Sequence, residues 1–184
     1  MTRITLGRPH ALWVMTLATL ALAALSSVAS AHLMVAQKGT LKLGKGGYYF
    51  VVSLPVSAFS GVDDDADGSL NKRELKAHDA ALKAAIVEGF TLKSVSKGPL
   101  PIEGLLLQMG HTHSKRRAKH IIAMGRFNVD AEVRDLTLET GLFGTGKRAS
   151  RLTIAFTRGN DKERAILTPE APSHRLFDWP QERR

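Results

Sequence analysis

Short apolar segments, separated by glycine, proline or charged residues, fill the chain after Gly89 and restrict the folds open to it. They are FTLKSV (90–95), GLLLQM (104–109), KHIIAMGRFNV (119–129), VRDLTLET (133–140), RLTIAFTR (151–158) and RAILT (164–168). Short segments that recur about every ten residues with turn signals between them are typical of antiparallel sheets, and most often of a sandwich. Two earlier segments, 32–43 and 48–54, have similar character, and we expect them to join the same sheets. The sequence therefore predicts a mainly antiparallel, sandwich-like β fold.

One long segment has the opposite character and predicts a helix. In LNKRELKAHDAALKAAIVEG (70–89), Leu75, Leu82 and Ile86 recur at helical spacing among good helix formers. Gly89 stands where a glycine commonly ends a helix. With this helix, the fold class becomes α+β, and 184 residues suffice for one domain with a substantial core.

The first 31 residues differ from the rest and predict a secretory signal peptide. Arg3 and Arg8 precede an apolar run at 11–25, and small residues then lead to Ala31. The run is shorter than the roughly 20 residues that span a bilayer, which favours cleavage over the alternative of a retained membrane anchor. We expect residues 32–184 to form a single exported domain, periplasmic or secreted, with no membrane span after signal removal. Its proline-rich end, from Thr168, predicts a loosely ordered tail.

Composition removes several classes of site and partner. The chain has no cysteine, so disulfides and thiolate metal sites are excluded. Its formal net charge is +9, and loss of Arg3 and Arg8 with the signal would leave +7. A basic balance can indicate nucleic-acid binding, but an exported protein does not meet nucleic acid, and we expect no such partner.

The stretch VDDDADGSLNKREL (62–75) places oxygen donors at the spacing of a calcium-binding loop. Counted from Asp63 as position 1, the donors at positions 1, 3, 5, 7, 9 and 12 are Asp63, Asp65, Asp67, Ser69, Asn71 and Glu74. Ca²⁺ takes about seven oxygens, and alternate residues of a curled loop can point at one centre. Gly68 permits a sharp turn at position 6, and a long glutamate at position 12 can offer both carboxylate oxygens. The alternative is a solvated acidic turn that caps the following helix.

This stretch resembles the EF-hand family over about thirty residues, and residues 55–89 would form the helix–loop–helix inserted between strands. The resemblance implies side-chain ligation of Ca²⁺ by Asp63, Asp65, Asp67 and Glu74, by the Ser69 carbonyl, and by Asn71 through a water. The entering segment, VSAFSGV, is short for a helix, and no second loop of this spacing occurs, although EF-hands usually pair. The chain is also similar to exported bacterial proteins that carry one EF-hand in a β-rich domain.

Histidines define a competing hypothesis. A mature N-terminal His32 would offer an amine and an imidazole together, as copper sites of the histidine-brace type do, and His111 with His113 could bind Zn²⁺ or Cu²⁺ from one face of a strand. The sequence carries no nucleophile signature, and we expect no enzyme. The prediction is an exported protein that binds one Ca²⁺ in a mainly structural role. The alternatives are a periplasmic copper-handling protein that uses His32, and a protein-interaction module with an unidentified partner.

Overall fold

The computed structural model describes residues 37–110, 116–130 and 132–178, which all belong to one compact unit. Strands hold nearly half of these residues and far more of them than helices do, as the sequence predicts. The strands are β1 (Lys38–Gly44), β2 (Gly47–Pro55), β3 (Leu70–Asn71), β4 (Phe90–Ser94), β5 (Gly98–Pro99), β6 (Ile102–Met109), β7 (Arg117–Ala118), β8 (His120–Phe127), β9 (Leu136–Thr140), β10 (Leu152–Arg158), β11 (Asp161–Leu167) and β12 (Ser173–Arg175). Two short α-helices, α2 (Lys72–Ala77) and α3 (Asp79–Gly89), and one 3₁₀ turn, η1 (Val56–Ala58), complete the described elements.

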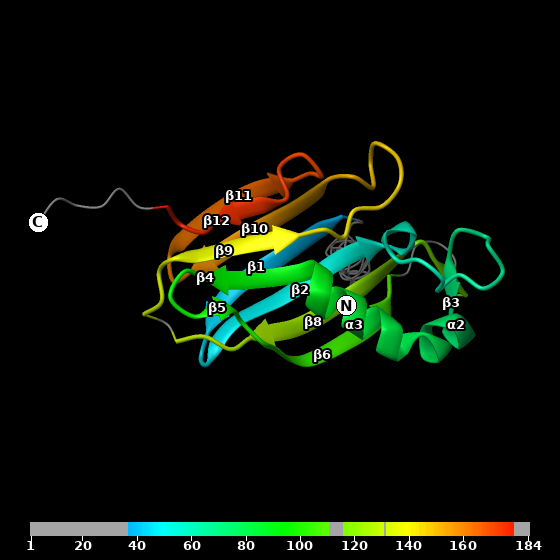
Figure 1. The fold of residues 1–184 in the computed structure, drawn as a ribbon, viewed down its shortest axis with the longest axis horizontal. Coiled ribbons are helices and arrows are strands. Elements are labelled where there is room, and N and C mark those ends of the chain that lie inside the picture. The colour runs from blue at the N-terminus through cyan, green and yellow to red at the C-terminus, as the bar shows by residue number, and fades with distance from the viewer. Residues whose placement is uncertain (1–36, 111–115, 131, 179–184) are drawn as a thin grey trace, which may run out of the picture. The chain divides into compact units, whose positions relative to one another are not determined.

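The longer strands form two sheets that pack against each other (Figure 1). The larger sheet has the order β11-β10-β1-β2-β8-β6, and the smaller one has the order β12-β9-β4-β5. Their inner faces meet through aromatic side chains. The rings of Phe50 on β2 and Phe90 on β4 lie 5.3 Å apart, and those of Phe156 on β10 and His174 on β12 also lie 5.3 Å apart. Strict alternation of buried and partly exposed residues, clearest in β10, gives each strand one inner face. The α+β fold with mainly antiparallel sheets is thus confirmed.

One pairing departs from the antiparallel pattern. β1 runs parallel to β10, with Leu41 opposite Phe156, while β1 pairs antiparallel with β2 on its other side. The sheet is therefore mixed. A parallel neighbour requires a long crossover, and here more than one hundred residues separate the two strands, so nothing local in the sequence could indicate the pairing.

The predicted long helix is interrupted at His78. This residue has φ −102° and ψ 11°, and it ends α2 and precedes α3. Hydrogen bonds continue across the interruption, from the His78 amide to the Glu74 carbonyl at 2.9 Å and from the Leu82 amide to the His78 carbonyl at 2.9 Å. Leu82 and Ile86 on α3 are fully buried in the core. None of the helices in the described residues is long and apolar enough to span a membrane.

Residues 168–178, the described part of the tail predicted from Thr168, are held by specific contacts and are not loosely ordered. β12 pairs antiparallel with β9, and both Leu176 and Phe177 are buried. The backbone amide of Phe177 donates to both carboxylate oxygens of Glu163, at 3.1 Å each. The guanidinium carbon of Arg158 lies 4.4 Å from the centre of the Phe177 ring. These contacts join Phe177 to Glu163 on β11 and to Arg158 on β10, and composition alone does not reveal them. The proline-rich composition of this segment was therefore a misleading guide to its order.

Candidate metal centre

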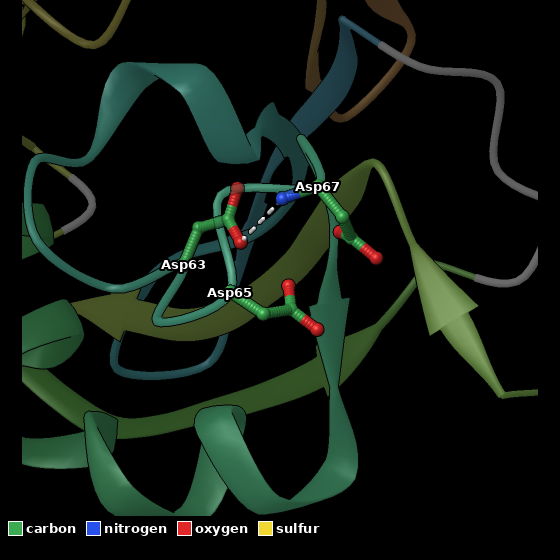
Figure 2. A group of neighbouring side chains, drawn as sticks. All are labelled: Asp63, Asp65 and Asp67. Atoms are coloured by element: carbon green, nitrogen blue, oxygen red, sulfur yellow. Dashed lines mark hydrogen bonds between the residues drawn. The ribbon is translucent and has the colours of Figure 1, made fainter.

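The segment that leads into β3 and α2 lies at one end of the sandwich (Figure 1). Three of its aspartates converge. One ligand atom from each of Asp63, Asp65 and Asp67 lies within 4.8 Å of the others. Figure 2 shows the three carboxylates gathered on the same side of the loop, although each comes from a different position along it. Hard divalent cations prefer such carboxylate oxygens, so the group has the donor type that Ca²⁺ or Mg²⁺ requires.

The loop backbone folds around the Asp63 side chain. One Asp63 oxygen accepts a hydrogen bond from the Asp67 amide at 3.2 Å, and the other accepts from the Gly68 amide at 2.7 Å. To make this turn, Ala66 and Gly68 take left-handed conformations, with φ of 53° and 77°. Nothing lies within 4 Å of the position that a Gly68 side chain would occupy. Conformation rather than space therefore favours glycine at position 6.

Ser69 orients the Asp67 carboxylate. Its amide and its hydroxyl both donate to Oδ1 of Asp67, at 2.9 and 2.7 Å. These two bonds occupy one oxygen and leave Oδ2 for a cationic partner. The hydroxyl is therefore a hydrogen-bond donor to the cluster. This bond leaves free the backbone carbonyl of Ser69, which is the ligand that the sequence predicts.

Glu74 lies in the first turn of α2 and is not a member of the three-aspartate group. Glu74 is buried, with 2% exposure. Its Oε1 accepts a hydrogen bond from the Asp64 amide at 3.1 Å, and its Oε2 accepts one from the Asn71 amide at 2.8 Å. Each carboxylate oxygen accepts one hydrogen bond, so each keeps a lone pair that can accept another. The carboxylate thus links the two ends of the loop through backbone amides.

Asn71 caps helix α2. Its Oδ1 accepts from the amides of Arg73 and Glu74, at 2.8 and 3.1 Å, and together with the returning Glu74 bond this forms a capping box. The side-chain oxygen is directed at the helix N-terminus, whereas the sequence analysis predicted that it serves the ion through a water. Asn71 and Glu74 are ligands in the coordination hypothesis and capping residues in the alternative. In the structure, both of their side chains contribute to the cap of α2.

A cation from elsewhere in the chain occupies the side of the cluster. The guanidinium of Arg117 on β7 forms an ion pair with Asp67, and its Nη2 lies 3.4 Å from Oδ2 of Asp65. The arginine is half-exposed, so solvent screens part of this attraction. Arg117 is the residue at this site that sequence reasoning missed. The basic stretch around it was visible, but its position beside a loop some fifty residues away was not.

A two-stranded sheet connects the loop to the body of the protein. β3, at loop positions 8 and 9, pairs antiparallel with β7, with Leu70 opposite Ala118. Both residues are buried in the core, at 0% and 1% exposure. The loop thus has a strand partner despite the lack of a second loop of its kind, and this partner delivers Arg117 to the acidic cluster.

The electrostatics of the loop reflect its crowded carboxylates. Desolvation, followed by the negative charge of Glu74, raises the pKa of Asp65, and the proximity of Arg117 opposes this shift. Asp64, at the non-ligating position 2, points away and bonds to Nε2 of His78 at 2.8 Å. A divalent cation at the cluster would favour the ionised form of Asp65, so its binding should weaken in acid.

The competing copper hypothesis rests on histidines that the structure does not describe. His32, His111 and His113 lie outside the described residues, as does the predicted signal peptide. His120, which begins β8, is 4% exposed, and its Nε2 has no hydrogen-bond partner among the described residues. Burial lowers the pKa of this histidine.

Comparison with protein-family models and with curated proteins gives no match for this chain.

Proposed function

We propose that the protein is an exported calcium-binding protein in which one Ca²⁺, held by residues 63–74, stabilises the fold. The observation that carries this proposal is the convergence of Asp63, Asp65 and Asp67 within 4.8 Å, in a loop that also has glutamate at position 12. A capping turn requires Asn71 and Glu74 but does not require three aspartates on alternate positions to converge. Their mutual repulsion would oppose folding without a cation.

The position of the loop supports a structural role. Glu74 ties the loop start to its end, and β3 joins it to buried residues through β7. An ion that ordered the aspartates would therefore reinforce contacts that already reach the core. The entering segment is reduced to η1 and a turn, and no opening groove follows from this arrangement, so we infer no calmodulin-like switch.

The affinity expected for such a site is modest. Extracellular calcium modules commonly have dissociation constants of about 10⁻⁴ to 10⁻³ M. At a free calcium concentration ten times the dissociation constant, the stabilisation is RT ln 11, about 1.4 kcal/mol, provided that the unfolded chain does not bind. In a domain of this size, that corresponds to a rise of a few degrees in melting temperature.

The test is calorimetric titration of the protein purified after export, without an N-terminal tag. We expect one equivalent of Ca²⁺ to bind, Asp65→Asn combined with Asp67→Asn to abolish binding, and Asp64→Asn to leave it nearly unchanged. Equal losses from the double variant and the Asp64 control, or no binding in the wild type, would refute the proposal. Intact mass of the exported protein tests cleavage after Ala31, on which the periplasmic or secreted localisation depends.

A further inference from the structure

The outer face of the six-stranded sheet carries side chains that neither the core nor the calcium proposal uses. Leu41, Phe50 and Phe156 point inward and are buried, so their neighbours along β1, β2 and β10 point to the opposite face. Cross-strand register shows which outward residues stand side by side. The face is about 24 Å wide, since six strands are spaced about 4.8 Å apart.

One row across this face is rich in cations. In strand order from β11 to β6, it consists of Lys162, Thr157, Lys42, Tyr49, Arg126 and Glu103. Lys42 and Lys162 are exposed and form no ion pair with a described residue. Glu103 is engaged already, because it pairs with Arg126 and accepts from the Asn128 amide at 2.7 Å. This row therefore offers uncompensated positive charge.

The neighbouring row is mostly apolar. It consists of Arg164, Ala155, Thr40, Val51, Met124 and Leu106, in the same strand order. Leu106 is 61% exposed at the β6 edge, and Ile166, near the opposite edge on β11, is 49% exposed. Tyr49 is 47% exposed between them in the cationic row. Single exposed apolar residues are common, but here three share one face with the cations.

The outward positions of the six strands have an unbalanced charge. Lys38, Lys42, Arg126, Lys162 and Arg164 are the described cations, and Glu103 is the one described carboxylate. Elsewhere on the described surface, Lys93 pairs with Glu139 and Lys97 pairs with Asp130. The complement of this face is therefore an anionic surface.

We propose that this face binds the surface of an anionic phospholipid bilayer. Lysine and arginine would attract the headgroup phosphates, and the exposed Leu106, Ile166 and Tyr49 would enter the interfacial region, where tyrosine is favoured. A soluble polyanion would satisfy the cations but would provide no apolar environment for Leu106 and Ile166. The joint presence of both kinds of side chain across the width of the sheet therefore selects the bilayer.

The experiment is sedimentation of the protein with vesicles of mixed phosphatidylglycerol and phosphatidylcholine, in chelator, so that calcium does not bridge protein and lipid. We expect binding that is absent with pure phosphatidylcholine and that weakens with salt. Removing one cation should weaken binding about fivefold, so Lys42→Glu with Lys162→Glu should weaken it at least about 25-fold. Lys72→Glu with Lys76→Glu, the same charge change on exposed positions of α2, should weaken it much less.

A second pair of variants tests the apolar contribution. Leu106→Ser with Ile166→Ser should reduce vesicle binding and remove the part that survives high salt, while Val95→Ser, at a residue 90% exposed elsewhere, should not. Circular dichroism establishes that each variant is folded. Absence of vesicle binding at low salt, or equal losses from the two charge-reversal pairs, would overturn the proposal. Soluble polyphosphate binding as tightly as vesicles, with no effect of the serine variants, would also overturn it.

Discussion

Asn71 and Glu74 hold each other's backbone: the Asn71 side chain accepts from the Glu74 amide at 3.1 Å, and the Glu74 side chain accepts from the Asn71 amide at 2.8 Å. This reciprocal pair starts helix α2 at the residue that would complete the calcium loop. The proposed ligand at position 12 is therefore fixed in place by the helix cap before any ion arrives.

Glu74→Gln should separate the two functions of this residue. Glutamine can keep the capping-box bond through its one carbonyl oxygen, but it cannot also accept from the Asp64 amide, so the calcium-free variant should lose about 1 to 3 kcal/mol of stability. It would lose the charge and one carboxylate oxygen, and the rise of a few degrees in melting temperature that calcium produces should largely disappear. Thermal melts with chelator and with excess Ca²⁺ measure both effects. A variant that retains the full calcium-dependent rise would show that Glu74 is a capping residue alone.

Arg117→Gln should tighten calcium binding. The guanidinium contacts Asp65 and Asp67, and an incoming Ca²⁺ must either displace it or bind beside its positive charge. Because the ion pairs are half-exposed, the expected gain in affinity is about two- to fivefold. Lys119→Gln removes the same charge from a nearby exposed position without contact to the cluster, and it should have less effect in calorimetry. Weaker binding in Arg117→Gln would indicate that the arginine organises the loop rather than competing with the ion.

Gly68→Ala should destabilise the protein through backbone strain alone. The residue has φ 77°, where an L-residue costs about 1 to 2 kcal/mol, and an added methyl group would meet no atom within 4 Å. Gly141→Ala is the matched control, since its side chain would also enter open space but its φ lies outside the left-handed region. Urea denaturation should show a loss near 1 kcal/mol for the first variant and little for the second. Equal losses would exclude conformation as the reason for glycine at position 6.

Local sequence patterns were sufficient to predict much of this fold and of the loop. Contacts between distant segments could not be predicted from the sequence. The strands after Gly89 were predictable because one face of each packs on the core, which imposes alternation on the sequence. The convergence of Asp63, Asp65 and Asp67 was predictable for a similar reason, because twelve consecutive residues define the loop. Arg117 reaches the same site only through the β3–β7 pairing, and a pairing between distant segments leaves no periodic signal.

His120 should make the protein sensitive to mild acid. Burial lowers the pKa of its imidazole below the ordinary value of 6.5, so the unfolded chain takes up the proton first as the pH falls. The stability that the neutral, buried His120 contributes is complete above the pKa of this histidine in the unfolded chain, and it is lost progressively as the pH falls below that value. His120→Leu removes this titration and the unpartnered Nε2, so its melting temperature should fall less than that of the wild type between about pH 7 and 5. Identical pH profiles would show that other groups control acid stability.

The C-terminal segment should contribute substantially to stability, despite its tail-like composition. Phe177 is 8% exposed, its amide bonds to Glu163, and its ring lies under Arg158. Phe177→Ala would open a cavity and remove the cation–π contact, and we expect a loss of about 3 kcal/mol or more in the free energy of unfolding. Val95→Ala, at a residue 90% exposed, is the control and should change stability by less than about 0.5 kcal/mol. Urea denaturation compares the two, and a loss at Phe177 no larger than that at Val95 would mean that residues after Thr168 are held only loosely.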